Sequence, residues 1–250
     1  MISLDHQRYP QFHYVMKALR KIKKLSDPPP LSDIRTYETY WLRRGESRER
    51  ARIEDISQNH RKKILARLLD DHCSLLDIGC GNCSFFDVLS QTKPTIDATG
   101  TEISDDICEI GRSKGYRVIK KDYSREQVAE EYDYITVLNV LEHMYHAEEL
   151  MMNLKNAFRK SLFVSVPNLG YIKYRIQLGL FGRMPNTGCF YHIREHIRFW
   201  TYADFHAWAD YYGFRVNKVW GNSWSDYLNK FPGLFASNIL YELKRKNHLS

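Results

Sequence analysis

The run Leu75-Leu76-Asp77-Ile78-Gly79-Cys80-Gly81 decides the fold, because it places a short apolar strand directly before a turn that contains two glycines. Glycine lets the backbone approach a ligand closely. In open parallel sheets, ligands bind at the carboxyl edge of the strands, where such a turn lies. A second acid, Glu102, ends the next expected strand 21 residues after Gly81, a position that suits the two hydroxyls of a ribose. We therefore predict a nucleotide-type ligand at this turn.

Strands and helices alternate after this turn. Expected strands lie at 74–78, 96–101, 116–120, 134–138 and 161–166, and expected helices at 82–91, 105–114 and 146–159. Ser104 precedes the second of these helices and is a residue type that caps helices. The alternation predicts an α/β fold, a Rossmann-like, doubly wound, mostly parallel sheet. Beyond residues 168–199, which we interpret as an inserted substrate segment or lid, the pattern resumes with a helix over about 201–212 and strands near 214–220 and 234–241.

The positive charge of the chain is concentrated ahead of the glycine turn. The net charge is +7, and residues 1–71 carry 16 Lys and Arg against 10 Asp and Glu, whereas residues 72–250 carry 21 against 20. We interpret residues 1–71 as a basic helical N-terminal extension and residues 72–250 as the main domain. Within the extension, residues 12–25 combine an apolar helical stripe with basic residues, and a second helix is expected over about 47–69. The short helix over 12–25 favours a peripheral membrane or protein contact over nucleic acid.

The composition also limits the compartment and the class of protein. A hydrophobic content of 43% excludes general disorder, and the sequence has no apolar run of 18 residues and no secretory signal pattern. The five cysteines are odd in number and irregularly spaced, which is typical of reduced thiols. Cys80 and Cys83 have the spacing of a metal or redox pair, but no second pair follows, so we expect neither use. These features predict a cytoplasmic protein.

The charges around the turn select the ligand. Ser84 stands where the dinucleotide fingerprint has its third glycine, and Asp77 disfavours a pyrophosphate while it suits a positive amine. S-adenosylmethionine carries an ammonium and a sulfonium and no phosphate, so we predict it as the cofactor. Tyr116 and Lys120 match the spacing of a short-chain dehydrogenase pair, but on one strand they lie about 13 Å apart and cannot act on one carbonyl.

Four motifs in order extend this prediction. They are L-L-D-I-G-C-G (75–81), T-G-T-E-I-S (99–104), K-D-Y (121–123) and Y-D-Y-I-T-V-L-N-V-L-E-H-M (132–144). Together they resemble the class I S-adenosylmethionine-dependent methyltransferases. The resemblance implies that the cofactor is bound by Asp77, Gly79, Cys80, Gly81, Glu102, Ile103, Asp122, Tyr123 and Asn139. By this resemblance the first acid and the glycines line the methionine end, Glu102 holds the ribose, Asp122 and Tyr123 hold the adenine, and Asn139 lies beneath the sulfur.

The segment after the fourth strand indicates the acceptor class. Enzymes that methylate base amines have an Asn/Asp-Pro-Pro-aromatic motif there, and this chain has Asn139-Val140-Leu141-Glu142. Glu142 and His143 resemble the Leu-Glu-His of ubiquinone-type O-methyltransferases, so we predict both as catalytic, with His143 as general base. The alternative is that His143 caps the next helix or packs structurally. The members that bind a metal have an acid where this chain has Asn139, so we expect no metal.

Later motifs resemble the MetW-like branch of methionine biosynthesis. They are V-P-N-L-G (166–170), G-R-M-P (182–185) and H-I-R (196–198). Predicted acceptor-binding residues are Asn168, Tyr171, Arg175, Arg183, His196 and Arg198. Their basic and aromatic character favours a hydroxyl-bearing acceptor with a carboxylate or phosphate, such as a glycan, a nucleotide-sugar or a small acid. A solvated basic lid is the competing interpretation. We predict O-methylation of a sugar, glycan or small metabolite, and the alternative is a MetW-like non-catalytic or regulatory partner of a biosynthetic enzyme.

Overall fold

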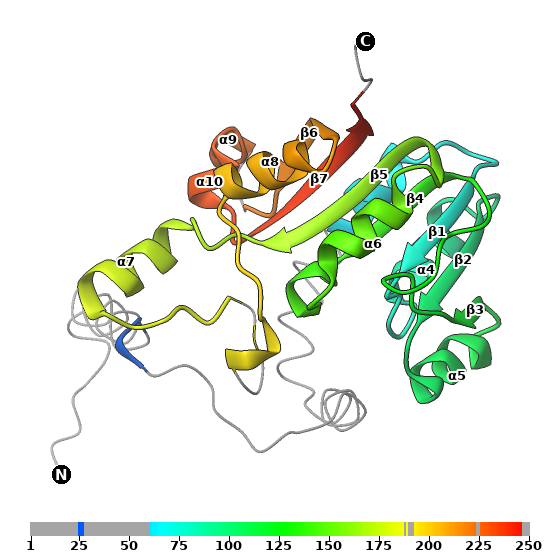
Figure 1. The fold of residues 1–250 in the computed structure, drawn as a ribbon, viewed down its shortest axis with the longest axis horizontal. Coiled ribbons are helices and arrows are strands. Elements are labelled where there is room, and N and C mark those ends of the chain that lie inside the picture. Colours follow the sequence, from blue (N-terminus) through cyan, green and yellow to red (C-terminus); the bar gives the residue numbers. More distant parts are fainter. Residues whose placement is uncertain (1–24, 28–60, 188, 190–192, 224–225, 247–250) are drawn as a thin grey trace, which may run out of the picture.

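The computed structural model describes residues 25–27, 61–187, 189, 193–223 and 226–246 of the chain. They build a seven-stranded sheet in the order β3-β2-β1-β4-β5-β7-β6 (Figure 1). The strands are β1 (Ser74–Ile78), β2 (Asp97–Glu102), β3 (Arg117–Lys120), β4 (Tyr132–Leu138), β5 (Phe158–Pro167), β6 (Phe214–Gly221) and β7 (Asn238–Arg245). β1 to β5 pair in parallel, and β7 runs antiparallel to both β5 and β6. The expected mostly parallel, doubly wound sheet is confirmed.

Helices cover both faces of this sheet. They are α4 (Ser84–Thr92), α5 (Asp105–Ser113), α6 (Ala147–Leu154), α7 (Ile172–Phe181), α8 (Tyr202–Tyr211), α9 (Asp226–Asn229) and α10 (Pro232–Phe235), with the 3-10 turns η1 (Leu141–His143) and η2 (Ile193–Glu195) and a further helix over 61–68. Successive strand residues point to opposite faces. Leu76 and Ile135 accordingly share a core with α6 and α8, whereas Leu75 and Tyr134 share another with α4, α5 and the helix over 61–68.

The strand order reverses between β1 and β4, which are hydrogen-bonded neighbours. From β1 the chain winds outward through β2 and β3, then returns to β4 and continues to β5. The crossovers therefore leave the carboxyl ends of β1 and β4 uncovered at this switch point, which is where open α/β sheets bind ligands. The glycine turn follows β1 and η1 follows β4, so the topology brings both predicted motifs to one edge.

Several expected boundaries differ from the observed ones. The helix expected over 146–159 ends at Leu154, and β5 begins at Phe158, earlier than expected. The strand expected near 234–241 is wrong in its first part, because Pro232 opens α10 and the strand runs from Asn238 to Arg245. Ser104 is the N-cap residue of α5, but its side chain makes no cap hydrogen bond. The segment interpreted as a lid contains α7, which extends away from the sheet in Figure 1.

The two helices predicted for the N-terminal extension fall largely outside the described residues. The helix expected over 12–25 and the first part of the one expected over 47–69 lie there, whereas residues 61–68 are helical. Leu65 and Leu69 are buried against the sheet, so residues from 61 onward belong to the packed domain, and the boundary we placed at 71 lies inside it. None of the described helices is long and apolar enough to cross a membrane.

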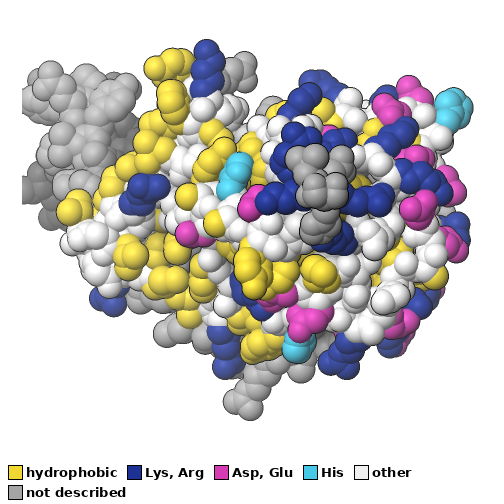
Figure 2. All heavy atoms as spheres, turned by 45° about the horizontal axis from the view of Figure 1, so that its top comes forward, with side chains coloured by type: hydrophobic (Ala, Val, Ile, Leu, Met, Phe, Trp, Pro, Cys, Tyr) yellow, Lys and Arg dark blue, Asp and Glu magenta, His cyan; other side chains and the backbone are white. Residues whose placement is uncertain are grey.

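A basic groove lies on the sheet away from the glycine turn. It has a volume of about 710 Å³ and is lined by the cationic side chains of Arg159, Lys160, Arg215, Lys218, Lys244 and Arg245, together with Glu242. Figure 2 shows Lys and Arg side chains gathered on this part of the surface. The nearly neutral total of residues 72–250 therefore conceals a local concentration of positive charge, which strand pairing brings together from β5, β6 and β7.

Candidate active site

The turn after β1 requires glycine at Gly79 and Gly81. Both residues have left-handed backbone angles, with φ of 67° and 53°. A Cβ added to Gly79 would lie 2.6 Å from Cγ2 of Val140, in the segment that follows β4. Residues that carry a side chain rarely adopt such backbone angles, and a Cβ at position 79 would also collide with Val140. The glycine therefore allows the turn after β1 and the turn after β4 to touch.

Cys80 holds the turn from within the protein. Its backbone N–H donates to the Thr101 carbonyl at 3.0 Å, and its carbonyl accepts from the Cys83 N–H at 3.0 Å. Its thiol is buried, and a Cβ added to Gly100 would lie 2.7 Å from Sγ. The expected cofactor contact of Cys80 is therefore reinterpreted: its polar atoms bind the protein, and the residue fixes the shape of the turn.

Glu102 joins the end of β2 to the glycine turn. One carboxylate oxygen accepts from the Gly81 N–H at 3.2 Å, and the other accepts from the Ile103 N–H at 2.7 Å. The side chain is 2% exposed, whereas the neighbouring Ile103 is 54% exposed. A fixed buried carboxylate beside an exposed apolar side chain fits a ribose that carries a flat base.

Asp77 is the buried acid before the turn. It is 2% exposed, and its Oδ1 accepts from the Thr136 hydroxyl at 2.6 Å. Burial raises the pKa of Asp77 to about 7, although the Thr136 hydroxyl and the charge of Lys62 both act to lower it. A positive ligand group placed beside this carboxyl would favour its ionised form, so the residue fits an ammonium.

Asp122 and Tyr123 lie after β3. Oδ1 of Asp122 accepts from the N–H and the hydroxyl of Ser124, at 3.1 and 2.6 Å, so this carboxylate also shapes its own turn. Tyr123 is 6% exposed and packs in the core. The side chain of Tyr123 is therefore structural, and its carbonyl accepts from the Asn153 side chain at 2.9 Å. The expected adenine contact would then fall to the backbone N–H of Tyr123.

Asn139 orients the carboxylate of Glu142. This residue has a left-handed φ of 55° directly after β4. Its side-chain oxygen accepts from the Ser165 hydroxyl at 3.2 Å, and its side-chain nitrogen donates to Oε1 of Glu142 at 2.7 Å. The amide thus links β5 to η1. The amide therefore has two protein partners, and the position beneath the cofactor sulfur that the resemblance implies for Asn139 stays a prediction.

Glu142, His143 and His196 form a cluster at this edge. One donor atom from each lies within 4.8 Å of the others, and the rings of His143 and His196 are 4.7 Å apart. Nδ1 of His143 lies 2.6 Å from the Glu195 carbonyl, and Nδ1 of His196 lies 2.9 Å from the Thr187 hydroxyl. Since a carbonyl only accepts, the proton of His143 sits on Nδ1, and Nε2 carries the lone pair.

The protonation of the cluster follows from its burial. Burial raises the pKa of Glu142, against the effects of His143 and Asn139. Burial, together with the neighbouring His143, lowers the pKa of His196 to about 3, which keeps this ring neutral. His143 is exposed, so the cluster presents one accessible imidazole to solvent and two buried groups behind it.

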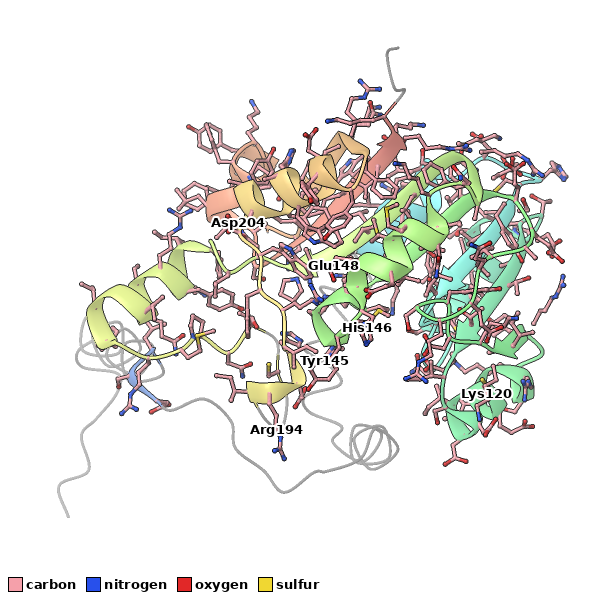
Figure 3. All side chains as sticks on the ribbon, in the orientation of Figure 1. Lys120, Tyr145, His146, Glu148, Arg194 and Asp204 are labelled. Carbon is pink, nitrogen blue, oxygen red and sulfur yellow. The ribbon has the colours of Figure 1, made fainter. Side chains whose placement is uncertain are left out.

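The segment around residue 196 is held against η1 and the start of α6. The Glu142 carbonyl accepts from the N–H groups of Ile197 and Arg198, at 2.9 and 3.2 Å. The Arg198 guanidinium binds the carbonyls of Met144 and Tyr145 and pairs with Glu148. Figure 3 shows Tyr145 and Glu148 at this junction, with Arg194 on the adjoining turn. Arg198, predicted to bind the acceptor, therefore acts here as a clamp between two segments.

The remaining predicted acceptor residues lie around α7. The Asn168 side chain is 1% exposed, donates to the carbonyls of Pro232, Gly233 and Ala236, and accepts from the Gly170 N–H. This amide is committed to the backbone, which corrects its expected role as an acceptor contact. Arg175 donates to the Gly170 carbonyl.

Tyr171 and Arg183 flank α7. The Tyr171 ring packs edge-on against Tyr174 at 5.2 Å, and Arg183 is exposed beyond the end of the helix. The three arginines expected to grip an anion thus contact different parts of the protein: Arg175 binds the start of α7, Arg183 follows its end, and Arg198 binds α6.

Sequence reasoning missed the residues that orient the site. Thr136 holds Asp77, Thr187 holds His196, and the Glu195 carbonyl holds His143. Each partner lies at least 9 residues away in the chain, and the longest of these separations is 59 residues. Thr136 lies within the motif over 132–144, but nothing in that motif marks its contact with Asp77. Thr187 and Glu195 lie in none of the quoted motifs, because such pairings are set by the fold.

Comparison with protein families assigns the chain to a known family. The chain matches the family described as Methionine biosynthesis protein MetW over residues 59–238, well over half of its length. No curated protein matches it by sequence.

Solved structures share the fold at low identity. The methyltransferase in a complex with the Trm112 activator of Haloferax volcanii is 13% identical, with a TM-score of 0.62 over 86% of this chain and 100% of that one. An S-adenosylmethionine-dependent methyltransferase from Thermotoga maritima is 15% identical, with a TM-score of 0.58 over 82% and 97%. Another from Archaeoglobus fulgidus is 16% identical, with a TM-score of 0.54 over 77% and 98%.

The cofactor expected from the sequence agrees with the fold, since the structures from Thermotoga maritima and Archaeoglobus fulgidus, both named as S-adenosylmethionine-dependent methyltransferases, share this fold. The buried acid, the left-handed glycine turn and the fixed carboxylate at the end of β2 fit that group. The chain belongs to the Methionine biosynthesis protein MetW family and has the fold of the class I S-adenosylmethionine-dependent methyltransferases.

Proposed function

We propose that the chain is an S-adenosylmethionine-dependent methyltransferase that acts on a hydroxyl of a sugar, glycan or small metabolite. The observation that carries the proposal is the contact between two turns: Gly79, in the cofactor turn, lies against Val140, two residues before Glu142. The predicted cofactor site and the Glu142–His143 pair are therefore neighbours at one edge of the sheet.

The cofactor is proposed to bind across the carboxyl ends of β1 and β2. Asp77 would face its ammonium group, the backbone of Gly79 to Gly81 its methionine end, and Glu102 its ribose hydroxyls. When bound, S-adenosylmethionine supplies an electrophilic methyl group. The protein then has to hold an acceptor oxygen in line with that methyl group and assist the loss of its proton.

His143 is placed to meet the acceptor. Its Nδ1 proton is held by the Glu195 carbonyl, so the lone pair of Nε2 is available to a hydroxyl. Glu142 lies behind it, buried and oriented by Asn139, and stabilises the positive charge that the imidazole gains when it accepts a proton. This arrangement supports base catalysis on an oxygen acceptor, whose proton has to leave, over transfer to a neutral amine.

The test is methyl transfer from labelled S-adenosylmethionine to a metabolite and glycan extract, with mass spectrometry of the products. We expect label on a hydroxyl and at least a hundredfold fall in kcat for His143→Gln, with a normal rate for His146→Gln, an exposed histidine three residues away. Transfer only to amines, or only to short RNA, would contradict the acceptor class.

A non-catalytic role is the second candidate, and the surface of α7 favours it. Leu178 is 51% exposed and Leu180 78% exposed on this projecting helix. Exposed apolar residues on one helix are typical of a protein contact. In that case the chain would bind S-adenosylmethionine in calorimetry, transfer no methyl group, and change the rate of a partner enzyme. The basic helix expected over 12–25 would be a further contact for a partner or an anionic membrane.

A further inference from the structure

The cluster of Glu142, His143 and His196 has the composition of a metal site that the sequence does not show. Two of its members are adjacent on η1, and the third comes from a segment more than fifty residues later. The sequence expectation of no metal rested on Asn139, which stands where related enzymes have an acid. The structure supplies His196 as a third ligand from another direction.

Each member has one atom held by the protein and one that is left for a ligand. Oε1 of Glu142 accepts from Asn139, whereas Oε2 is buried and has no hydrogen-bond partner among the described residues. A buried carboxylate oxygen without a partner is costly, which points to a ligand that the oxygen would bind. The whole Glu142 side chain is 1% exposed, so solvent does not satisfy this atom.

The two imidazoles are oriented in the same manner. Their Nδ1 atoms contact the Glu195 carbonyl and the Thr187 hydroxyl, which leaves both Nε2 atoms for the cluster. Histidine ligands commonly bind a metal through one nitrogen while the other bonds to a carbonyl or polar group that fixes the ring. Asn139, Glu195 and Thr187 thus have the positions of a supporting shell around three ligands.

We propose that Glu142, His143 and His196 bind one first-row divalent transition metal ion, with open positions that take hydroxyls of the acceptor. Two imidazoles and one carboxylate suit Zn²⁺, Co²⁺, Mn²⁺ or Fe²⁺ and do not suit Ca²⁺, which prefers oxygen ligands alone. Donor atoms around tetrahedral Zn²⁺ lie about 3.4 Å apart. Small rotations of Glu142 and the exposed His143 would close the observed cluster, whose donors lie within 4.8 Å, around an ion.

The metal site adds to the proposed function. Only the role given to the acceptor hydroxyl rests on that function, and metal binding itself does not. A bound ion lowers the pKa of a coordinated hydroxyl, so the proton leaves to solvent at neutral pH. His143 is then a ligand, and the ion replaces its imidazole as the group that activates the hydroxyl. The methyl acceptor and the cofactor site stay as proposed.

The test measures metal binding by the full chain, without cofactor or acceptor. After treatment with a chelator, the protein is titrated with Co²⁺ and followed by visible absorption, and Zn²⁺ binding is measured by calorimetry. We expect one ion per chain, at least a hundredfold weaker binding in Glu142→Gln and in His196→Ala, and wild-type binding in His146→Ala. Thr187→Val should weaken binding by about tenfold to a hundredfold, because it removes only the group that orients His196.

Other outcomes separate the alternatives. Circular dichroism and S-adenosylmethionine calorimetry show whether each variant is folded. Wild-type Co²⁺ affinity in folded Glu142→Gln and His196→Ala would overturn the metal site, as would thiolate absorption bands, which would assign the ion to Cys80 and Cys83, whose sulfurs lie 3.7 Å apart. Failure of the proposed function would appear differently, as stoichiometric metal binding without methyl transfer to any hydroxyl.

Discussion

Asp77→Asn is expected to make the cofactor-free protein more stable while it weakens cofactor binding. Asp77 is 2% exposed, and burial raises its pKa from 3.8 to about 7. Three pKa units correspond to about 4 kcal/mol, the free energy that ionisation of this carboxyl costs in the fold relative to the unfolded chain. Asn carries no charge, and its oxygen can still accept from the Thr136 hydroxyl.

The pH dependence of the free energy of unfolding tests whether the charge of Asp77 destabilises the fold. Because the folded pKa of Asp77 lies above its unfolded value, the wild type loses stability as the pH rises from about 4 toward 7, by about 1.4 kcal/mol per unit. Asp77→Asn lacks this loss. Its stability advantage should therefore grow by about 3 kcal/mol between pH 5 and pH 8.

Urea unfolding, followed by circular dichroism at pH 5, 6, 7 and 8, measures the advantage. Asp133→Asn is the matched control, because Ser74 lowers the pKa of Asp133 through hydrogen bonds from its N–H and its hydroxyl. This control should lose about 1 kcal/mol at neutral pH. Calorimetry should show S-adenosylmethionine binding to Asp77→Asn weakened by about thirtyfold or more, since its ammonium loses a charged partner. Equal stability of Asp77→Asn and wild type at pH 8, or an advantage that does not grow with pH, would refute the reasoning.

Three further changes test the geometry of the site. Gly79→Ala should lower S-adenosylmethionine affinity at least tenfold in calorimetry, because its Cβ would collide with Val140 at a left-handed φ; unchanged affinity would contradict the close approach of the two turns. Asn168→Ala should lower the free energy of unfolding by about 3 kcal/mol, because three backbone carbonyls lose their donor. A loss below about 1 kcal/mol would contradict this structural role and favour the predicted contact with the acceptor. Arg198→Gln should lower the free energy of unfolding by about 1 kcal/mol, because it removes the ion pair with Glu148, and it should change the acceptor KM less than twofold. A large change in KM in a stable variant would instead support the predicted role of Arg198 in binding an anionic acceptor.

The succession of parallel strands along the chain could be predicted because each strand carries its own local signal. Three of these signals can be recognised in the sequence alone: the apolar run before Gly79, the acid Glu102 and the strand before Asn139. All three lie where we expect them. The last strand, expected near 234–241, begins at Asn238 instead, also for a local reason. Leu234 and Phe235 are apolar enough for a strand, but Pro232 favours a helix start and opens α10. The side-chain roles of Asn168 and Arg198 could not be predicted, since their partners lie 50 or more residues away.

The sequence by itself determined the α/β class, the family and the cofactor turn, because glycine conformation, strand–helix alternation and short motifs act over a few residues. Only the tertiary structure decided which of the polar side chains face one another. Backbone hydrogen bonds from the N–H groups of Ile197 and Arg198 to the Glu142 carbonyl bring His196 to the end of β4. They arise from the packing of distant segments, which no local pattern encodes. Burial likewise has no sequence signature. It raises the pKa of Asp77, and it leaves one Glu142 oxygen without a hydrogen-bond partner among the described residues.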